Sequence, residues 1–146
     1  MHVAALAIGA CLLLSACAAP AATPRDPIAA ARQLPDASDA VRDGDATASC
    51  GQIALDQGEV LPDSALDCLA DAAGTTPAEL AWSFPTTEGD PIVSFAFVGP
   101  DFDGVRVFTT SEYDSFGGDG PNWTGISCPD ARDVTGAGNC KQLVEG

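Results

Sequence analysis

The apolar residues change their spacing along the chain, and this spacing predicts one helix followed by three to four strands. After Pro62 the apolar residues recur at helical intervals up to Gly74, and between Glu79 and Phe84 they alternate with polar or small residues. Further apolar runs, each bounded by turn residues, lie at 92–98, 105–110 and 123–128. The pattern therefore predicts an α+β fold, in which one helix packs on a small antiparallel meander of three to four strands.

The first residues form an unbroken run of apolar and small side chains over 3–19, which ends at Pro20. A membrane-spanning helix needs about 20 predominantly apolar residues, so this run is more typical of the central part of a secretory signal. Its end, Leu14-Ser15-Ala16-Cys17, resembles the lipobox of bacterial lipoproteins. The resemblance implies that residues 1–16 are a lipoprotein signal peptide and that Cys17 carries the lipid. An ordinary cleaved signal and an uncleaved membrane helix remain the alternatives.

Residues 17–49 are expected to form a disordered tether. The segment consists mainly of Ala, Pro, Asp, Thr and Ser, and such a composition buries too little apolar surface to offset the entropy of ordering. A flexible coil of this length spans roughly 30 Å on average. A short helix between Ile28 and Leu34 stays open, although it would be marginal in isolation. The globular domain is then expected over 50–146.

Four cysteines remain in the predicted mature domain, and an even number in a small exported domain indicates two disulfides. They are Cys50, Cys68, Cys128 and Cys140. Sequence alone leaves three pairings open, of which we favour the local one, Cys50 with Cys68 and Cys128 with Cys140. Each of these two disulfides would contribute about 3 kcal/mol to the free energy of unfolding. A zinc site is disfavoured, because no Cys-x-x-Cys pair exists and the single histidine, His2, lies in the predicted signal.

The charge of the chain narrows the class of its partners. It has 21 acidic residues against 6 lysines and arginines, a formal net charge of −15. Nucleic acid is a poor partner for such a chain, since phosphate binding depends on clustered Lys and Arg. The expected contacts are a membrane, through the N-terminal lipid, and a basic envelope protein or a cationic cell-wall component.

One sequence signature resembles a known family. Residues 86–92 read TTEGDPI, residues 113–117 read YDSFG, and Cys128 follows. Together they resemble a domain-of-unknown-function family of short exported bacterial lipoproteins, over roughly 57–128. The resemblance implies an exported lipoprotein on the extracytoplasmic face of a cell membrane, and it implies no activity.

Three carboxylates near these motifs are candidates for a cation site: Glu88, Asp90 and Asp114. The motifs flank strands that are expected to be neighbours, and converging carboxylates would favour calcium. The composition of Glu88-Gly89-Asp90-Pro91 is better explained as a turn, because Gly tolerates positive φ and Asp binds its own backbone. The aromatic residues of the predicted strands are expected in the core: Trp82, Phe95, Phe97 and Phe108.

The residue types present argue against catalysis. With His2 in the predicted signal, no Ser-His-Asp or Cys-His arrangement is available, and the four domain cysteines are expected in disulfides. The sequence therefore predicts a lipid-anchored, non-catalytic interaction protein of the cell envelope, with no cofactor. A calcium-stabilised ligand-binding domain is the second hypothesis, and a carboxylate-dependent hydrolase is the third.

Overall fold

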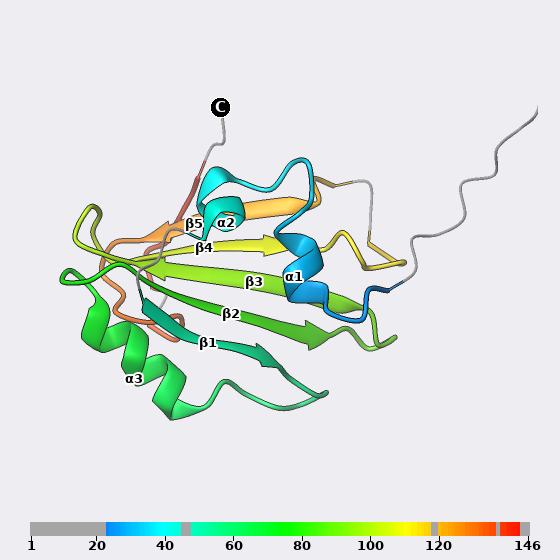
Figure 1. Ribbon diagram of the computed structural model, residues 1–146, viewed down its shortest axis with the longest axis horizontal. Helices are drawn as coiled ribbons and strands as arrows, with labels where there is room; N and C mark the ends of the chain where they lie inside the picture. The colour runs from blue at the N-terminus through cyan, green and yellow to red at the C-terminus, as the bar shows by residue number, and fades with distance from the viewer. Residues whose placement is uncertain (1–22, 45–47, 118–119, 137, 144–146) are drawn as a thin grey trace, which may run out of the picture.

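The computed structural model describes residues 23–44, 48–117, 120–136 and 138–143. Its main feature is a six-stranded sheet with the strand order β1-β2-β3-β4-β5-β6 (Figure 1). The elements are α1 (Pro27–Ala31), α2 (Asp39–Asp43), β1 (Ala48–Ala54), α3 (Asp63–Ala72), β2 (Ala78–Pro85), β3 (Pro91–Val98), β4 (Val105–Thr110), β5 (Trp123–Cys128) and β6 (Lys141–Gln142). The described residues are thus mostly β, with three short helices.

The predicted meander forms the centre of the sheet. Strands β2, β3, β4 and β5 pair antiparallel in chain order. The turn between β3 and β4 requires a glycine at 104, where φ is +72° and an added Cβ would lie 2.0 Å from the Cys128 carbonyl oxygen. The close approach of this turn to the end of β5 therefore depends on a residue without a side chain.

The predicted sheet of three to four strands is too small, and it is mixed rather than purely antiparallel. Strand β1 lies at one edge and pairs parallel to β2, with α3 as the connection between them. A parallel pair needs such a crossover, because a tight hairpin can join only antiparallel strands. The sequence of β1, ASCGQIA, holds one large aliphatic side chain, Ile53, so neither an apolar run nor an alternation of apolar and polar residues marks it as a strand.

The two disulfides follow the predicted local pairing. Cys50 is joined to Cys68 with a Cα–Cα distance of 5.5 Å, and Cys128 to Cys140 with a Cα–Cα distance of 4.2 Å. The first bond fixes β1 to α3, and the second fixes the end of β5 to the residues before β6. Both bonds therefore restrain edges of the sheet.

The prediction of a disordered tether over 17–49 is wrong for the part that contains α1 and α2. Ile28, Ala31, Ala37 and Val41 are buried against the sheet, in the same cluster as Phe95. Both helices have side-chain N-caps: Asp26 accepts a hydrogen bond from the Ala29 amide, and Ser38 from the Val41 amide. The few apolar residues of this segment suffice because the sheet completes their core, so the domain begins well before residue 50.

An ion pair holds this segment to the sheet. Arg32 pairs with Glu79 of β2, whose exposed fraction is 7%, and Arg32 Nη1 donates to Glu79 Oε2 at 3.1 Å. Arg32 Nη1 also donates to the Val41 carbonyl at 2.9 Å. The guanidinium lies 4.7 Å from the centre of the Phe95 ring. One side chain therefore joins the two short helices to the centre of the sheet.

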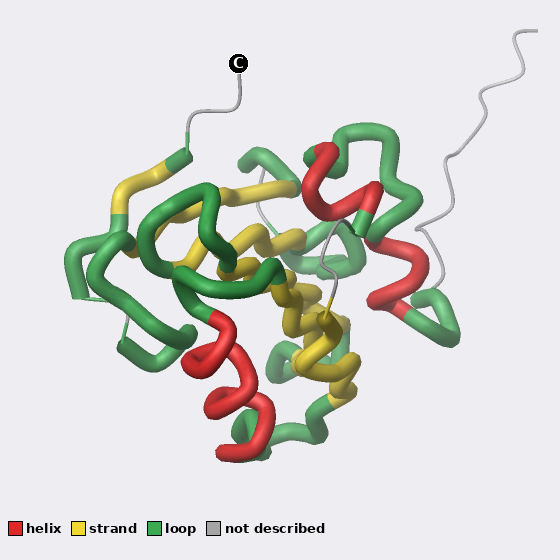
Figure 2. The backbone as a smooth tube through the Cα atoms, turned by 60° about the vertical axis from the view of Figure 1, so that its left-hand side comes forward, coloured by secondary structure: helices red, strands yellow, loops and turns green. Residues whose placement is uncertain are grey.

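Helices α1 and α2 cover one face of the sheet, and helix α3 covers the other (Figure 2). On the α1 and α2 face the core contains Phe95, Phe97 and Phe108, which confirms their prediction as core residues. On the other face Leu69 of α3 packs in a cluster with Leu80. Because both faces are covered, the middle of β3 is buried on both sides, unlike a strand with one solvent face.

Several predicted features lie outside the described residues: the signal peptide 1–16, the lipidation site Cys17 and the first residues of the predicted tether. Among the helices of the described ranges, none combines the length and apolar character that crossing a membrane requires.

Candidate functional site

The face of the sheet under α3 is covered only in part. Helix α3 has 10 residues, a length of about 15 Å, whereas the 8 residues of β2 extend over about 26 Å. Leu80 is fully buried, but Trp82 is half-buried and Phe84 has an exposed fraction of 39%. An aromatic strip is therefore left open toward the end of β2.

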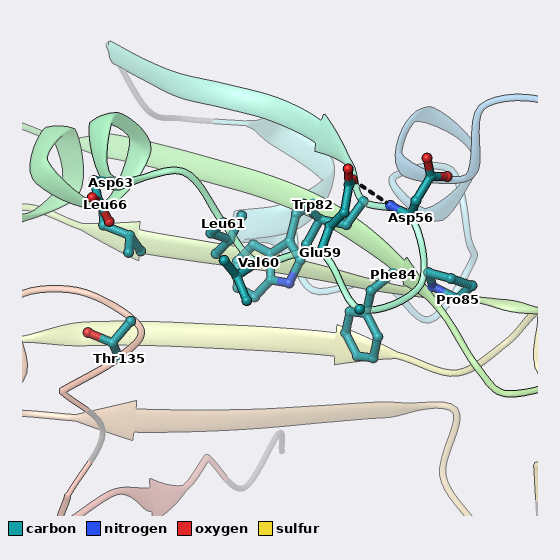
Figure 3. Close-up of a pocket in the computed structure, with 12 residues that line it drawn as sticks. Asp56, Glu59, Val60, Leu61, Asp63, Leu66, Trp82, Phe84, Pro85 and Thr135 are labelled. Atoms are coloured by element: carbon teal, nitrogen blue, oxygen red, sulfur yellow. Dashed lines mark hydrogen bonds between the residues drawn. The ribbon is translucent and has the colours of Figure 1, made fainter.

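A hollow of about 500 Å³ lies over this strip, and we call it the Trp82 hollow. It is lined by Leu55, Asp56, Gly58, Glu59, Val60, Leu61, Asp63, Leu66, Trp82, Phe84, Pro85 and Thr135. In Figure 3 Val60, Leu61 and Trp82 lie between Asp63 at one end and Phe84 with Pro85 at the other. The loop from β1 to α3 forms one wall, and the floor is the uncovered strip of β2.

All the charged residues that line the Trp82 hollow are acidic: Asp56, Glu59 and Asp63. Glu59 Oε2 accepts a hydrogen bond from the Asp56 amide at 2.8 Å, which fixes the turn that carries Val60 (Figure 3). Asp63 is the first residue of α3, and both aspartates are exposed. An apolar floor with an acidic rim attracts a ligand that combines an apolar group with positive charge.

A turn near the C-terminal end supplies the opposite wall of the hollow through Thr135. Asp133 Oδ1 accepts hydrogen bonds from the Thr135 hydroxyl at 2.6 Å, the Thr135 amide at 2.7 Å and the Gly136 amide at 3.2 Å. The hydroxyl of Thr135 is the main cause of a lowered pKa of Asp133, which burial partly opposes and the two amides reinforce. The ionised carboxylate therefore shapes this wall.

Asp133→Asn is expected to lower the free energy of unfolding by about 0.5–1 kcal/mol at pH 7. The pKa of Asp133 is lower in the folded protein than in the unfolded chain. Its contribution to stability is therefore present above the ordinary value of 3.8 and is lost as the pH falls through the lowered value. Urea unfolding at pH 7 and pH 3 should show the wild-type and variant curves converging at the lower pH. A difference that stays constant with pH, or that the exposed Asp130→Asn reproduces, would contradict this assignment.

The structure places two of the predicted cation-binding carboxylates in turns. Asp90 Oδ2 accepts a hydrogen bond from the Ser115 amide at 2.8 Å, and Asp114 Oδ1 accepts one from the Phe116 amide at 3.0 Å. The first five residues of TTEGDPI form the turn between β2 and β3, in which Gly89 has a φ of +95°, and β3 begins at Pro91. The prediction of a turn is confirmed, and Asp90 ties the two motifs of the signature together.

Glu88, Asp90 and Asp114 do not come together as the expected cation site, although Asp90 reaches the loop that carries Asp114. Within the described ranges, no three or more Asp, Glu, His and Cys residues form a group that could hold a metal ion. One oxygen of the Asp90 carboxylate and one of the Asp114 carboxylate instead accept hydrogen bonds from backbone amides of the 111–117 loop.

Sequence reasoning missed the Trp82 hollow. Trp82 was expected in the core and instead lies half-buried in the hollow's lining. Val60 and Leu61 gave a weak signal, as two aliphatic residues between the polar stretch 56–59 and Pro62. Asp56 and Asp63 gave none, because acidic residues occur throughout the chain. The hollow is visible only once the length of α3 is compared with that of β2.

No family model, no curated protein and no solved structure matches this chain. The resemblances of LSAC to a lipobox and of TTEGDPI to a lipoprotein family therefore stay predictions. The function has to be argued from the site itself.

Proposed function

We propose that this chain is a lipid-anchored protein of the bacterial cell envelope, whose acidic domain binds a cationic partner without catalysis on the outer face of the membrane. One observation carries the proposal: every charged residue that lines the Trp82 hollow is a carboxylate, over an aromatic floor. The acidity of the whole chain, a net charge of −15, acts in the same direction.

The disulfides support a location outside the cytoplasm. Disulfides persist in oxidising compartments and are rare in reducing ones. Both bonds of this domain, Cys50–Cys68 and Cys128–Cys140, restrain the edges of the sheet. Together with the lipobox-like end of the first apolar run, at Cys17, they favour export and anchoring by lipid.

The residue chemistry supports binding over catalysis. The described cysteines are joined in disulfides, and the single histidine of the chain, His2, falls in the predicted signal. Of the carboxylates in the Trp82 hollow, that of Glu59 binds the Asp56 amide. This arrangement favours a recognition surface over a hydrolase with a pair of working carboxylates.

Anchoring is expected to depend on Cys17. Cells that express the full chain and are fed a labelled fatty acid should show label on the wild-type protein, which should sediment with membranes. Cys17→Ala should lose both the label and the membrane association, because the acylated thiol and amine would be absent. Cys11→Ala is the matched control and should behave as wild type. Label that persists in Cys17→Ala and disappears in Cys11→Ala would refute the assignment.

Binding of a cation is expected to weaken with salt. The purified full chain should bind a fluorescent 12-residue peptide of alternating Lys and Ser, and should not bind the corresponding Glu and Ser peptide. Because the attraction arises at exposed carboxylates, the affinity for the peptide of Lys and Ser should fall several-fold as the salt concentration rises from about 50 to 300 mM. Fluorescence anisotropy measures both affinities. Equal affinity at the two salt concentrations would remove the electrostatic basis of the proposal.

A further inference from the structure

We propose that the Trp82 hollow is the docking surface for a segment of another envelope protein, in which one large apolar side chain is flanked on both sides by basic residues. The inference rests on the proposed function, since it specifies the class of the cationic partner and the residues that receive it.

The apolar part of the proposal follows from exposed side chains. The large apolar residues that stand exposed in the described part of the chain are Val60, Phe84 and Phe116, with exposed fractions of 82%, 39% and 76%. The first two line the hollow, where Trp82 lies half-buried beside them in the lining. A contiguous exposed apolar surface with a polar rim is typical of an interaction site.

The shape of the site favours a protein over a small molecule. Small-molecule sites bury most of the ligand surface, and they do so in enclosed clefts. Here Val60 remains almost fully exposed on the loop that walls the hollow, so it contacts a partner that lies over the surface. Protein interfaces have this form, with aromatic anchors at the centre and a polar rim around them.

The positions of the charges predict the pattern of the partner. Asp56 precedes Val60 on the loop and Asp63 follows it, and Figure 3 shows Val60 and Trp82 between the two aspartates. A bound segment would therefore place an apolar side chain on Trp82 and basic side chains toward Asp56 and Asp63. No residue that lines the hollow is basic, so this pattern meets no like charge.

The test uses the purified full chain in nanodiscs of uncharged lipid, with empty nanodiscs as the blank. The probes are three fluorescent 12-residue peptides. The Lys and Leu peptide consists of Lys residues around a central Leu, and the Lys and Ser peptide has Ser in place of that Leu. The third peptide consists of Glu residues around a central Leu. A fourth probe is an oligomer of de-N-acetylated glucosamine, which carries positive charge without apolar side chains. We expect the Lys and Leu peptide to bind at least five-fold more tightly than any other probe.

Paired variants separate the hollow from the general acidity of the domain. Asp56→Asn with Asp63→Asn should weaken the Lys and Leu peptide about ten-fold. Asp101→Asn with Asp103→Asn changes the net charge equally and should weaken it less than two-fold, since both residues lie outside the hollow. Val60→Ser should remove most of the preference for Leu, whereas Phe116→Ser should not. Both hydrophobic positions are exposed, so each variant is expected to fold, and thermal melts check this.

Each other outcome overturns the inference in a distinct way. Equal losses for the two aspartate pairs would show that binding follows net charge alone. Equal affinities of the Leu and Ser peptides would show that the apolar floor takes no part. Tighter binding of the glucosamine oligomer, weakened by Asp56→Asn with Asp63→Asn, would assign the hollow to a wall component. If none of the cationic probes binds, the proposed function fails together with this inference, whereas binding of the Lys and Ser peptide alone leaves the proposed function standing.

Discussion

Arg32→Met is expected to lower the free energy of unfolding by about 3 kcal/mol, a large share of the stability of a domain of this size. The substitution leaves the Glu79 carboxylate at 7% exposure without its ion-pair partner. It also removes the hydrogen bond to the Val41 carbonyl and the contact of the guanidinium with the Phe95 ring. These losses act together on the packing of α1 and α2.

A double-mutant cycle isolates the ion pair. Arg32→Met combined with Glu79→Met replaces both charges by apolar groups and should recover at least half of the loss, because no buried charge then remains unpaired. Arg25→Met makes the same charge change at an exposed position and should alter stability by less than about 0.5 kcal/mol. Chemical denaturation measures the wild type, Arg32→Met, Glu79→Met and the double variant, with Arg25→Met as the control. A double variant that is no more stable than Arg32→Met would contradict the role assigned to Glu79.

Removal of the Cys50–Cys68 disulfide by substitution of both cysteines with alanine is expected to cost about 3 kcal/mol. The bond closes a loop with a sequence separation of 18 residues, and the loss arises largely from the greater entropy of the unfolded chain. The bond also holds β1 to α3, and the loop between them carries Asp56 and Val60. We therefore expect the affinity of the Trp82 hollow for the Lys and Leu peptide to fall as well.

The second disulfide is the matched control for that double effect. Cys128–Cys140 spans a sequence separation of 12, so its removal should cost a similar free energy of unfolding. Its loop contributes only Thr135 to the lining of the hollow, and none of the carboxylates or large apolar residues that the peptide is proposed to contact, so peptide affinity should fall less than in the first variant. Thermal melts and anisotropy titrations measure the two effects separately. Equal losses of affinity in both variants would show that general destabilisation, and not the position of the loop, is the cause.

Some elements were predictable because their signal is local. Strand β4 (Val105–Thr110) and strand β5 (Trp123–Cys128) lie where the apolar runs and their bounding turns predict them. The two disulfides follow the shortest loops. In each case neighbouring residues carry the information, and the rest of the fold does not override it.

Other elements depend on contacts between distant residues, and the sequence pattern could not reveal them. Strand β1 has small side chains and forms because it pairs with β2 and is tied to α3 by Cys50. Helix α1 buries Ile28 and Ala31, helix α2 buries Val41, and the aromatic face of the sheet supplies the remaining surface. The alternation of Leu80, Trp82 and Phe84 placed them on one face, but their different burial results from where α3 begins, since its first turn borders the hollow.

The packing of α1 on the sheet also determines how the domain would stand at a bilayer. If Cys17 carries the lipid, residues 18–26 are the whole connection to α1, which begins at Pro27. Nine residues span at most about 30 Å, even when fully extended. The chain then enters on the α1 face, while the Trp82 hollow lies on the α3 face. A domain held this close would keep one face toward the lipid headgroups and would present the other outward, to proteins that approach from the envelope.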